Sequence, residues 1–142
     1  MIISAKGRYV LRVMIDLAER CDSGYIPMKD VAERQEISLK YLEKILPVLT
    51  KNNMIEGVHG KGGGYRLTRK PEEYSVGEIL RLTEGDLAPV ACLEYEPKPC
   101  GRTAHCRTLP MWQKFTRMMN DFFNSISIAD LMRDDYIEEI AK

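Results

Sequence analysis

Apolar residues recur every three or four positions in three stretches of the N-terminal part, the spacing of amphipathic helices. These stretches run from Ser4 to Arg20, from Met28 to Gln35 and from Leu39 to Asn52. Ser38 is the expected N-cap of the third helix, because its hydroxyl can accept a hydrogen bond from the first turn. Pro47 lies inside that helix and is expected to kink it or break its hydrogen-bond ladder. The inward positions are Tyr9, Val10, Val13, Met14, Leu17, Ala18, Val31, Ala32, Leu39, Leu42, Ile45, Leu46 and Leu49.

The next stretch predicts a β-hairpin. Residues 54–59 and 65–68 have the character of two short strands, and the connector GKGGG allows backbone angles that a side chain would forbid. A helix-turn-helix followed by a basic hairpin is a winged helix, whose third helix would enter a major groove while the hairpin follows the backbone or reaches a minor groove. The connector lacks the order of a phosphate-binding loop, and a strand rather than a helix follows it, which disfavours nucleotide binding.

The second half of the chain predicts two further helices. Ser75 can cap a short fourth helix that points Val76, Ile79, Leu80 and Leu82 toward the core. The last helix carries an apolar stripe at steps of three and four residues, close to a coiled-coil seam. A chain of this size could cover the stripe internally, but we expect a C2 homodimer in which the helix packs against its twin or across the twin's DNA-binding half. The stripe consists of Leu109, Trp112, Phe115, Met119, Phe122 and Ile126.

The expected fold is therefore mainly α with a small β-hairpin, a winged helix-turn-helix followed by a long C-terminal dimerisation helix. Residues 1–70 form the DNA-binding region, 71–106 the connecting helix and cysteine loop, 107–133 the dimerisation helix region, and 134–142 an acidic, solvated tail. The 142 residues contain no apolar run of the roughly 18 residues that a membrane span needs, and no signal peptide. We therefore expect a cytoplasmic protein with no membrane partner.

The charge is divided between the two halves, although the net charge is zero. Residues 1–70 carry 13 Lys and Arg against 8 Asp and Glu, and residues 71–142 carry the reverse balance of 8 against 13. A basic first half suggests a polyanionic partner, here double-stranded DNA. The outer side of the third helix offers Lys40, Tyr41, Glu43 and Lys44; a solvated helix face would look the same if no hairpin followed. Because phosphate repels a carboxylate, Glu43 is expected to accept from a cytosine amino group or to penalise wrong bases.

Three of the four cysteines form the pattern C-x7-C-x5-C at Cys92, Cys100 and Cys106. The segment between them has two prolines and little apolar material, so packing gives no reason for the thiols. In a cytosol that keeps thiols reduced, such a group indicates metal or redox chemistry, and thiolates are soft ligands for iron-sulfur clusters, zinc and copper(I). Cys21 stands alone and is expected to be a small, semi-buried bystander.

Several segments together resemble the IscR family of bacterial iron-sulfur cluster regulators and their winged-helix relatives NsrR, RirA and CymR. These are SAKGRYVLRVMIDLA, ISLKYLEKIL, VHGKGGGYRL, SVGEIL and the cysteine loop before a Trp-bearing helix, and the resemblance covers roughly residues 1–133. It implies a homodimeric transcription regulator that binds pseudo-palindromic DNA and holds a 2Fe-2S cluster through Cys92, Cys100 and Cys106. It also places Ser38, Lys40, Tyr41 and Glu43 on the recognition helix.

Two departures from the family pattern affect the expected sites. The wing position that is usually an arginine is His59 here, so minor-groove contact should be weaker, with Lys61 supplying part of the charge. The position of the fourth ligand in IscR is Leu109, and the first two cysteines are two residues further apart. The fourth ligand is therefore open between His105, Glu94, Glu96 and a residue of the other subunit.

Two other classes of function compete with a cluster-sensing regulator. The first is a zinc-bound or thiol-redox regulator with the same DNA-binding half, in which His105 completes a tetrahedral site with the three cysteines. The second is an enzyme or electron carrier. The sequence contains no recognisable nucleophile–base pair or substrate-binding motif, and a basic winged helix would have no role in an enzyme. We therefore do not expect an enzyme.

Overall fold

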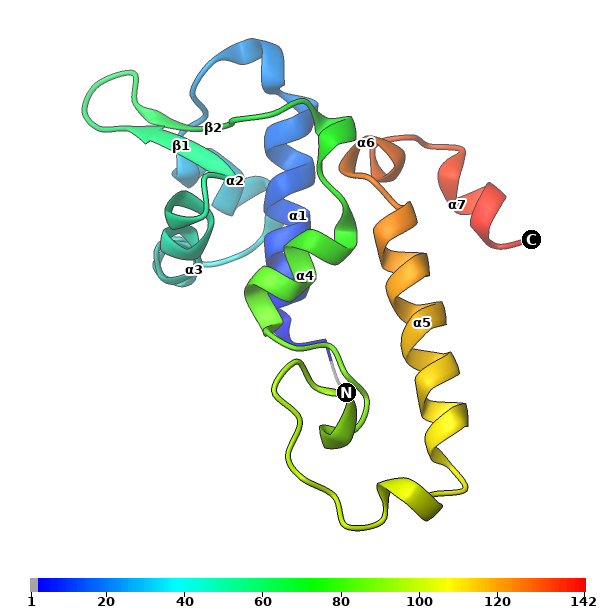
Figure 1. Ribbon diagram of the computed structural model, residues 1–142. Helices are drawn as coiled ribbons and strands as arrows, with labels where there is room; N and C mark the ends of the chain where they lie inside the picture. The colour runs from blue at the N-terminus through cyan, green and yellow to red at the C-terminus, as the bar shows by residue number, and fades with distance from the viewer. Residues whose placement is uncertain (1–2) are drawn as a thin grey trace.

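The computed structural model describes residues 3–142, and its elements follow the predicted order of a winged helix with a long C-terminal helix (Figure 1). α1 stands at the centre, with α2, α3 and the hairpin on one side and α5 on the other. None of the helices in this range is long and apolar enough to cross a membrane. The helices and strands are α1 (Ala5–Glu19), α2 (Met28–Gln35), α3 (Leu39–Lys51), β1 (Ile55–Val58), β2 (Gly64–Leu67), α4 (Val76–Glu84), α5 (Leu109–Ser125), α6 (Ile128–Leu131) and α7 (Tyr136–Ile140).

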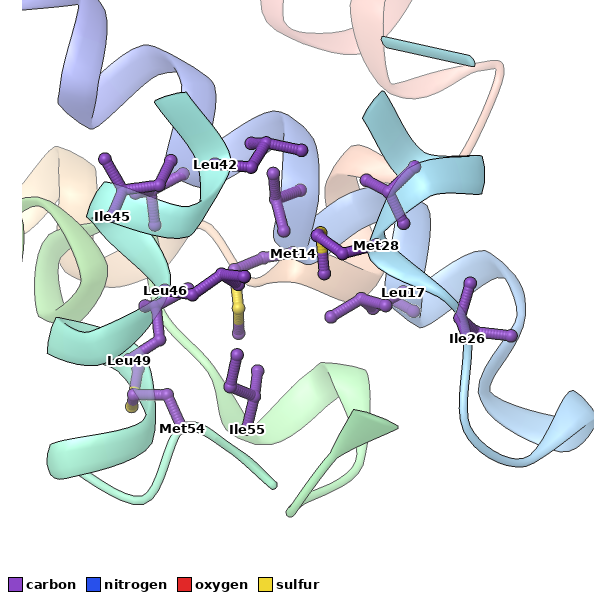
Figure 2. Packing of buried hydrophobic residues seen from close by; sticks show 14 of the residues in the cluster. Met14, Leu17, Ile26, Met28, Leu42, Ile45, Leu46, Leu49, Met54 and Ile55 are labelled. Carbon is purple, nitrogen blue, oxygen red and sulfur yellow. The ribbon is translucent and has the colours of Figure 1, made fainter. Parts of the chain in front are cut away.

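The main hydrophobic core forms around α1, because one face of this helix is buried along its length. Figure 2 shows Met14 and Leu17 of α1 among Leu46 of α3 and Met28 at the start of α2. Met14 is fully buried, and truncating a core side chain of this kind to alanine costs roughly 2–5 kcal/mol. The periodicity of the sequence thus predicted the helices and most of the faces that they bury; Leu39, expected to point inward, is instead exposed at the first turn of α3.

α3 does not break at Pro47. The helix runs from Leu39 to Lys51 through this residue, whose side chain is exposed. Proline lacks an N–H and its ring crowds the carbonyl four residues earlier, so Pro47 weakens the hydrogen-bond ladder at this turn. The helix is nevertheless continuous because its inward residues, Leu42, Ile45, Leu46 and Leu49, are all buried in the main core.

The hairpin pairs β1 and β2 in antiparallel register, with Glu56 opposite Arg66. Ile26, in the turn before α2, adds a short third edge, because its N–H and carbonyl each form a 2.8 Å hydrogen bond with the main chain of Tyr65. This close approach requires Gly64. A Cβ at that position would lie 2.3 Å from the main chain of Ile26, and its φ of 154° is one that side chains disfavour.

The C-terminal half packs partly differently from the prediction. Met119 and Ile126, two members of the expected dimer stripe, are buried within the protomer against α4. The end of α5 is fastened there by main-chain hydrogen bonds, from Val76 to Ile126 at 2.8 Å and from Ile128 to Tyr74 at 3.0 Å. The six stripe residues therefore do not share one free face.

The last nine residues are also not simply a solvated tail. They contain α7, and Tyr136 is buried in the second hydrophobic cluster. Arg133 pairs with Asp135 at 3.1 Å and with Glu139 at 2.6 Å, which stabilises the turn into α7. An apolar residue within an acidic segment was the signal that the sequence offered for this contact.

Candidate nucleic-acid interface and cysteine loop

The helix-turn-helix is made by α2, α3 and a tight turn between them. α2 ends at Gln35, and its C-cap residue Glu36 adopts the left-handed conformation, with a φ of 53°, which reverses the direction of the chain. Ile37 is then buried in the core, and the Ser38 hydroxyl accepts a 3.1 Å hydrogen bond from the N–H of Tyr41. This confirms Ser38 as the N-cap of α3. The connection from α2 to α3 is therefore short and held at both Ile37 and Ser38.

The outward side of α3 is polar and open. Lys40, Glu43 and Lys44 are exposed, and none of them forms an ion pair with another residue of the described range 3–142. Tyr41 is half-buried and packs against the core. Such a face can present two cationic groups to phosphates and one carboxylate to base edges.

A buried carboxylate holds α2 to α1. Asp16 is 1% exposed and accepts from both Arg34 nitrogens, at 2.7 and 3.1 Å, and from the Gln35 side chain at 2.9 Å. Burial by itself raises the pKa of Asp16. The hydrogen bonds from Arg34 and Gln35 and the charges of Arg34 and Arg20 lower the pKa by more than burial raises it, so it lies below its ordinary value. Asp16 was not among the residues predicted from the sequence. The signal was a charged residue between Met14 and Leu17 on an apolar face.

The hairpin extends away from the helices as a wing, with His59 and Lys61 exposed at its tip (Figure 1). Further down, Arg66 pairs with Glu56 across the strands and lies over the ring of Tyr25, 4.4 Å from its centroid. Arg66 is therefore paired across the strands, and the positive charge at the tip comes from Lys61. The tip and α3 lie on the same half of the molecule.

The cysteine loop lies at the other end of the molecule, below α4 and the start of α5 (Figure 1). Cys92 and Cys106 are half-buried, whereas Cys100 and His105 are exposed, and all four cysteines of the chain are free. Within residues 3–142, no three His, Cys, Asp or Glu side chains come together as a group that could hold a metal ion. The structure thus places the expected ligands on one loop without bringing them into a coordination geometry.

The thiol of Cys106 has a pKa below its ordinary value. The Thr108 hydroxyl lies 3.5 Å from its sulfur, and this hydrogen bond lowers the pKa of the thiol, helped by main-chain N–H groups at the start of α5 and by the charge of Arg102. A lower pKa favours the thiolate, which is the form that binds metals and attacks disulfides.

Two carboxylates that we did not single out fix the entry to the loop. The Glu84 Oε1 atom accepts from the Ser4 hydroxyl at 2.6 Å and from the N–H groups of Ser4 and Gly7 at 3.1 Å, so the end of α4 caps the start of α1. Asp86 accepts from the N–H of Ala88 at 2.8 Å and from the N–H of Tyr95. The loop is therefore tethered on both sides of Gly85, and no sequence motif marks either contact.

α5 presents an apolar row that differs from the stripe read in the sequence. Met111, Phe115, Met118 and Phe122 are between 41% and 60% exposed, at successive steps of four, three and four residues. A free methionine and phenylalanine row of this length on one helix is typical of a surface that another helix covers. Met111 and Met118 were missed because the predicted stripe took the adjacent positions instead, the half-buried Trp112 and the buried Met119.

The geometry defines a winged-helix transcription regulator: a recognition helix and wing on one half, and a thiol-rich loop with an apolar helix on the other. Comparison with known proteins supports this class. Residues 3–134 match the Rrf2 family, described as "Iron-dependent Transcriptional regulator". The chain therefore belongs to the Rrf2 family.

Two curated relatives cover nearly the whole chain. It is 33% identical to the HTH-type transcriptional regulator IscR of Aliivibrio salmonicida over 99% of this chain and 83% of that protein. It is 39% identical to the protein rrf2 of Nitratidesulfovibrio vulgaris, over 94% of this chain and 89% of that protein. These relatives support DNA-binding transcriptional regulation by this chain.

Two solved structures share the fold. The IscR of T. potens superposes with a TM-score of 0.74 at 33% identity, covering 94% of this chain and 88% of that one. CymR of B. subtilis, titled a global cysteine regulator, superposes with a TM-score of 0.76 at 29% identity, covering 93% and 96%. The IscR-like winged-helix architecture expected from the sequence is thus confirmed.

Proposed function

We propose that this chain acts as a homodimeric regulator that reads pseudo-palindromic DNA and responds to a 2Fe-2S cluster held on its cysteine loop. The observation that carries the proposal is the concentration of three free thiols on the connection from α4 to α5, which leaves α4 at Glu84, the residue whose carboxylate caps α1. The chain thereby links its thiol-rich segment directly to the central helix of the DNA-binding half.

The donor set of the loop fits an iron-sulfur cluster in kind. Cys92, Cys100 and Cys106 would supply thiolates, and His105 is our candidate for the fourth ligand, with Glu94, Glu96 or a residue of the other subunit as alternatives. A cluster with one non-cysteine ligand supplies an exchangeable site that is easier to lose or oxidise. The loop is exposed and carries few packing contacts, so it can rearrange to gather its ligands.

On DNA, α3 and the wing would contact different parts of the duplex. Lys40 and Lys44 would contact phosphates, while Tyr41 and Glu43 would face base edges from the major groove. Ser38 would act through the cap that orients the first turn of α3. His59 and Lys61 at the wing tip would lie along the backbone or in the adjacent minor groove.

The second subunit would cover the exposed row of α5. A C2 axis beside Met111, Phe115, Met118 and Phe122 would bury this row against its twin and place two recognition helices on successive half-sites. Ordering of the loop would then change the position of each winged helix relative to the dimer axis, and so the preferred DNA spacing.

The proposal is tested by anaerobic purification followed by a visible spectrum, iron and sulfide analysis, and DNA binding before and after removal of any cluster. We expect charge-transfer bands, about two irons and two sulfides per chain, as the proposed cluster requires, and a DNA preference that changes on removal. Cys92→Ser, Cys100→Ser and Cys106→Ser should each abolish the bands, whereas Cys21→Ser, outside the loop, should retain them. A His105→Ala variant with unchanged visible and Mössbauer spectra would exclude His105 as a ligand.

A zinc-bound or thiol-redox regulator is the second candidate. It is favoured by the lowered pKa of Cys106 and by the similarity to CymR, which is titled a cysteine regulator. A colourless protein with stoichiometric zinc, or a loop whose oxidation alone alters DNA binding, would establish this function instead.

A further inference from the structure

One face of α1 contacts both helices of the helix-turn-helix. Tyr9, Arg12 and Asp16 are spaced by three and four residues, which places them on one side of the helix. Asp16 holds Arg34 and Gln35 at the end of α2. Arg12 donates to the Gln35 side chain at 3.2 Å and also to its main-chain carbonyl.

Tyr9 makes the matching contact to the recognition helix. Its ring meets the ring of Tyr41 edge to face, with centroids 5.6 Å apart and planes at 85°. The guanidinium of Arg12 lies over the Tyr9 ring, 5.3 Å from its centroid. Both tyrosines are half-buried against the main core, so neither ring is free to turn into solvent. Arg12, Tyr9 and Tyr41 therefore form a continuous stack from α1 to the first turns of α3.

The turn adds the second constraint on α3. The end of α2 that α1 holds is separated from the start of α3 by three residues, Glu36, Ile37 and Ser38. The chain reverses direction at Glu36. The end of α2 is held by Arg12 and Asp16, and the inward face of α3 is buried in the core. The contact between Tyr9 and Tyr41 adds a restraint on the first turns of α3, where the helix would face base edges.

We infer that Tyr9 is a positioning residue for sequence reading: it fixes the Tyr41 ring, and with it the direction in which the first turns of α3 enter the major groove. This inference rests on the proposed role of α3 in DNA recognition. It assigns to α1 a part in specificity that does not require α1 to touch a base. Arg12 supports the same stack through its contacts with Tyr9 and Gln35.

The test compares specific with non-specific binding. The wild-type chain first selects its preferred duplex from a random-sequence pool, and each variant is then titrated with that duplex and with a scrambled duplex at two salt concentrations. Tyr9→Leu should lower the ratio of the two affinities roughly threefold to tenfold, the contribution expected of one aromatic pair. Non-specific affinity and its salt slope should stay close to those of the wild type, because no phosphate contact is removed. The thermal midpoint should fall modestly, because an aromatic pair packed against the core is lost.

Two further variants separate positioning from a general loss of fold. Tyr9→Phe keeps the ring and the stack, so it should retain the wild-type ratio. In a Tyr41→Leu background, Tyr9→Leu should change the ratio little, because its effect passes through Tyr41. A ratio for Tyr9→Leu within twofold of the wild type would overturn the inference, as would a parallel fall in both affinities together with the thermal midpoint. A wild-type chain that selects no sequence would overturn the proposed DNA reading itself, and this inference with it.

Discussion

The hydroxyl of Tyr74 donates a 2.7 Å hydrogen bond to the main-chain carbonyl of Met54, directly before β1. The same oxygen accepts the N–H groups of Thr68 and Arg69, each at 3.0 Å, directly after β2. Tyr74 is fully buried, and the guanidinium of Arg69 covers its ring at 4.3 Å. One phenol therefore closes the base of the wing and ties both of its ends to the chain that leads into α4.

Removing this hydroxyl should destabilise the protein. Tyr74→Phe keeps the ring but removes the acceptor of two part-buried N–H groups and the shortest of the hydrogen bonds to the Met54 carbonyl, which costs about 1–3 kcal/mol. Denaturant unfolding should show a lower midpoint with an unchanged slope. Tyr95→Phe is the matched control, because Tyr95 is 93% exposed and its loss of a hydroxyl should leave the midpoint unchanged. Equal midpoints for the two variants would contradict the role of Tyr74.

Asp16→Asn should lower stability at neutral pH by roughly 2–3 kcal/mol, the worth of charged hydrogen bonds to Arg34. The pKa of Asp16 is below its ordinary value in the folded chain, so its stabilisation is complete above the unfolded pKa of about 3.9 and is lost as pH falls through the folded pKa. The difference in unfolding free energy between the wild type and Asp16→Asn should therefore become smaller below about pH 4. Glu19→Gln, at an exposed position of α1, is the control. A difference in unfolding free energy that does not change with pH would argue against an ionised Asp16.

Gly7 and Glu84 should show coupled effects. A Cβ at Gly7 would lie 2.2 Å from the Glu84 carboxylate, so Gly7→Ala must displace the group that caps α1, at a cost of about 1 kcal/mol. In a Glu84→Ala background the clash is absent, and Gly7→Ala should be neutral or stabilising by up to about 1 kcal/mol, since alanine favours the helix. A double-mutant cycle from unfolding curves measures this; additive effects would refute the contact.

Met118→Glu should dissociate the proposed dimer. Met118 is 60% exposed in the protomer, so the monomer should keep its thermal midpoint, while a carboxylate buried against the twin helix should weaken association by roughly a hundredfold or more. Sedimentation velocity over a concentration series gives the readout. Gln113→Glu adds the same charge at another exposed position of α5 and should remain dimeric. A Met118→Glu variant as dimeric as this control would place the interface elsewhere.

Lys44 and Glu43 should affect DNA binding in different ways. Lys44→Ala should weaken binding to all sequences alike and reduce the salt slope by about 1, because it removes one phosphate contact. Glu43→Ala should keep non-specific affinity and relax the base preference at one position by roughly 1–3 kcal/mol. Competition titrations with single-base variants of the selected duplex distinguish the two. An identical salt slope for Lys44→Ala and wild type would remove Lys44 from the phosphate contacts.

The local pattern of the sequence was enough for the elements and for most of the core. The apolar period predicted α1, α2 and α3, Ser38 and Ser75 were found as caps, and the glycine-rich connector predicted the hairpin. The prediction from the apolar pattern was wrong for α5, where six apolar positions at helical spacing were taken as one face. Two of them, Met119 and Ile126, face α4 of the same chain, and the period alone does not say which neighbour covers a helix.

What the sequence determined by itself is thus local: where each helix begins, which residues share a face, and that three thiols lie on one loop beside a basic winged helix. What only the tertiary structure decided are the polar contacts between distant residues, such as Asp16 with Arg34, Tyr74 with Met54 and Glu84 with Ser4, which are 18, 20 and 80 residues apart. The physical reason is that helix periodicity and capping depend on residues within one or two turns, whereas a buried carboxylate or hydroxyl finds its partner only when packing of the whole chain brings the two together.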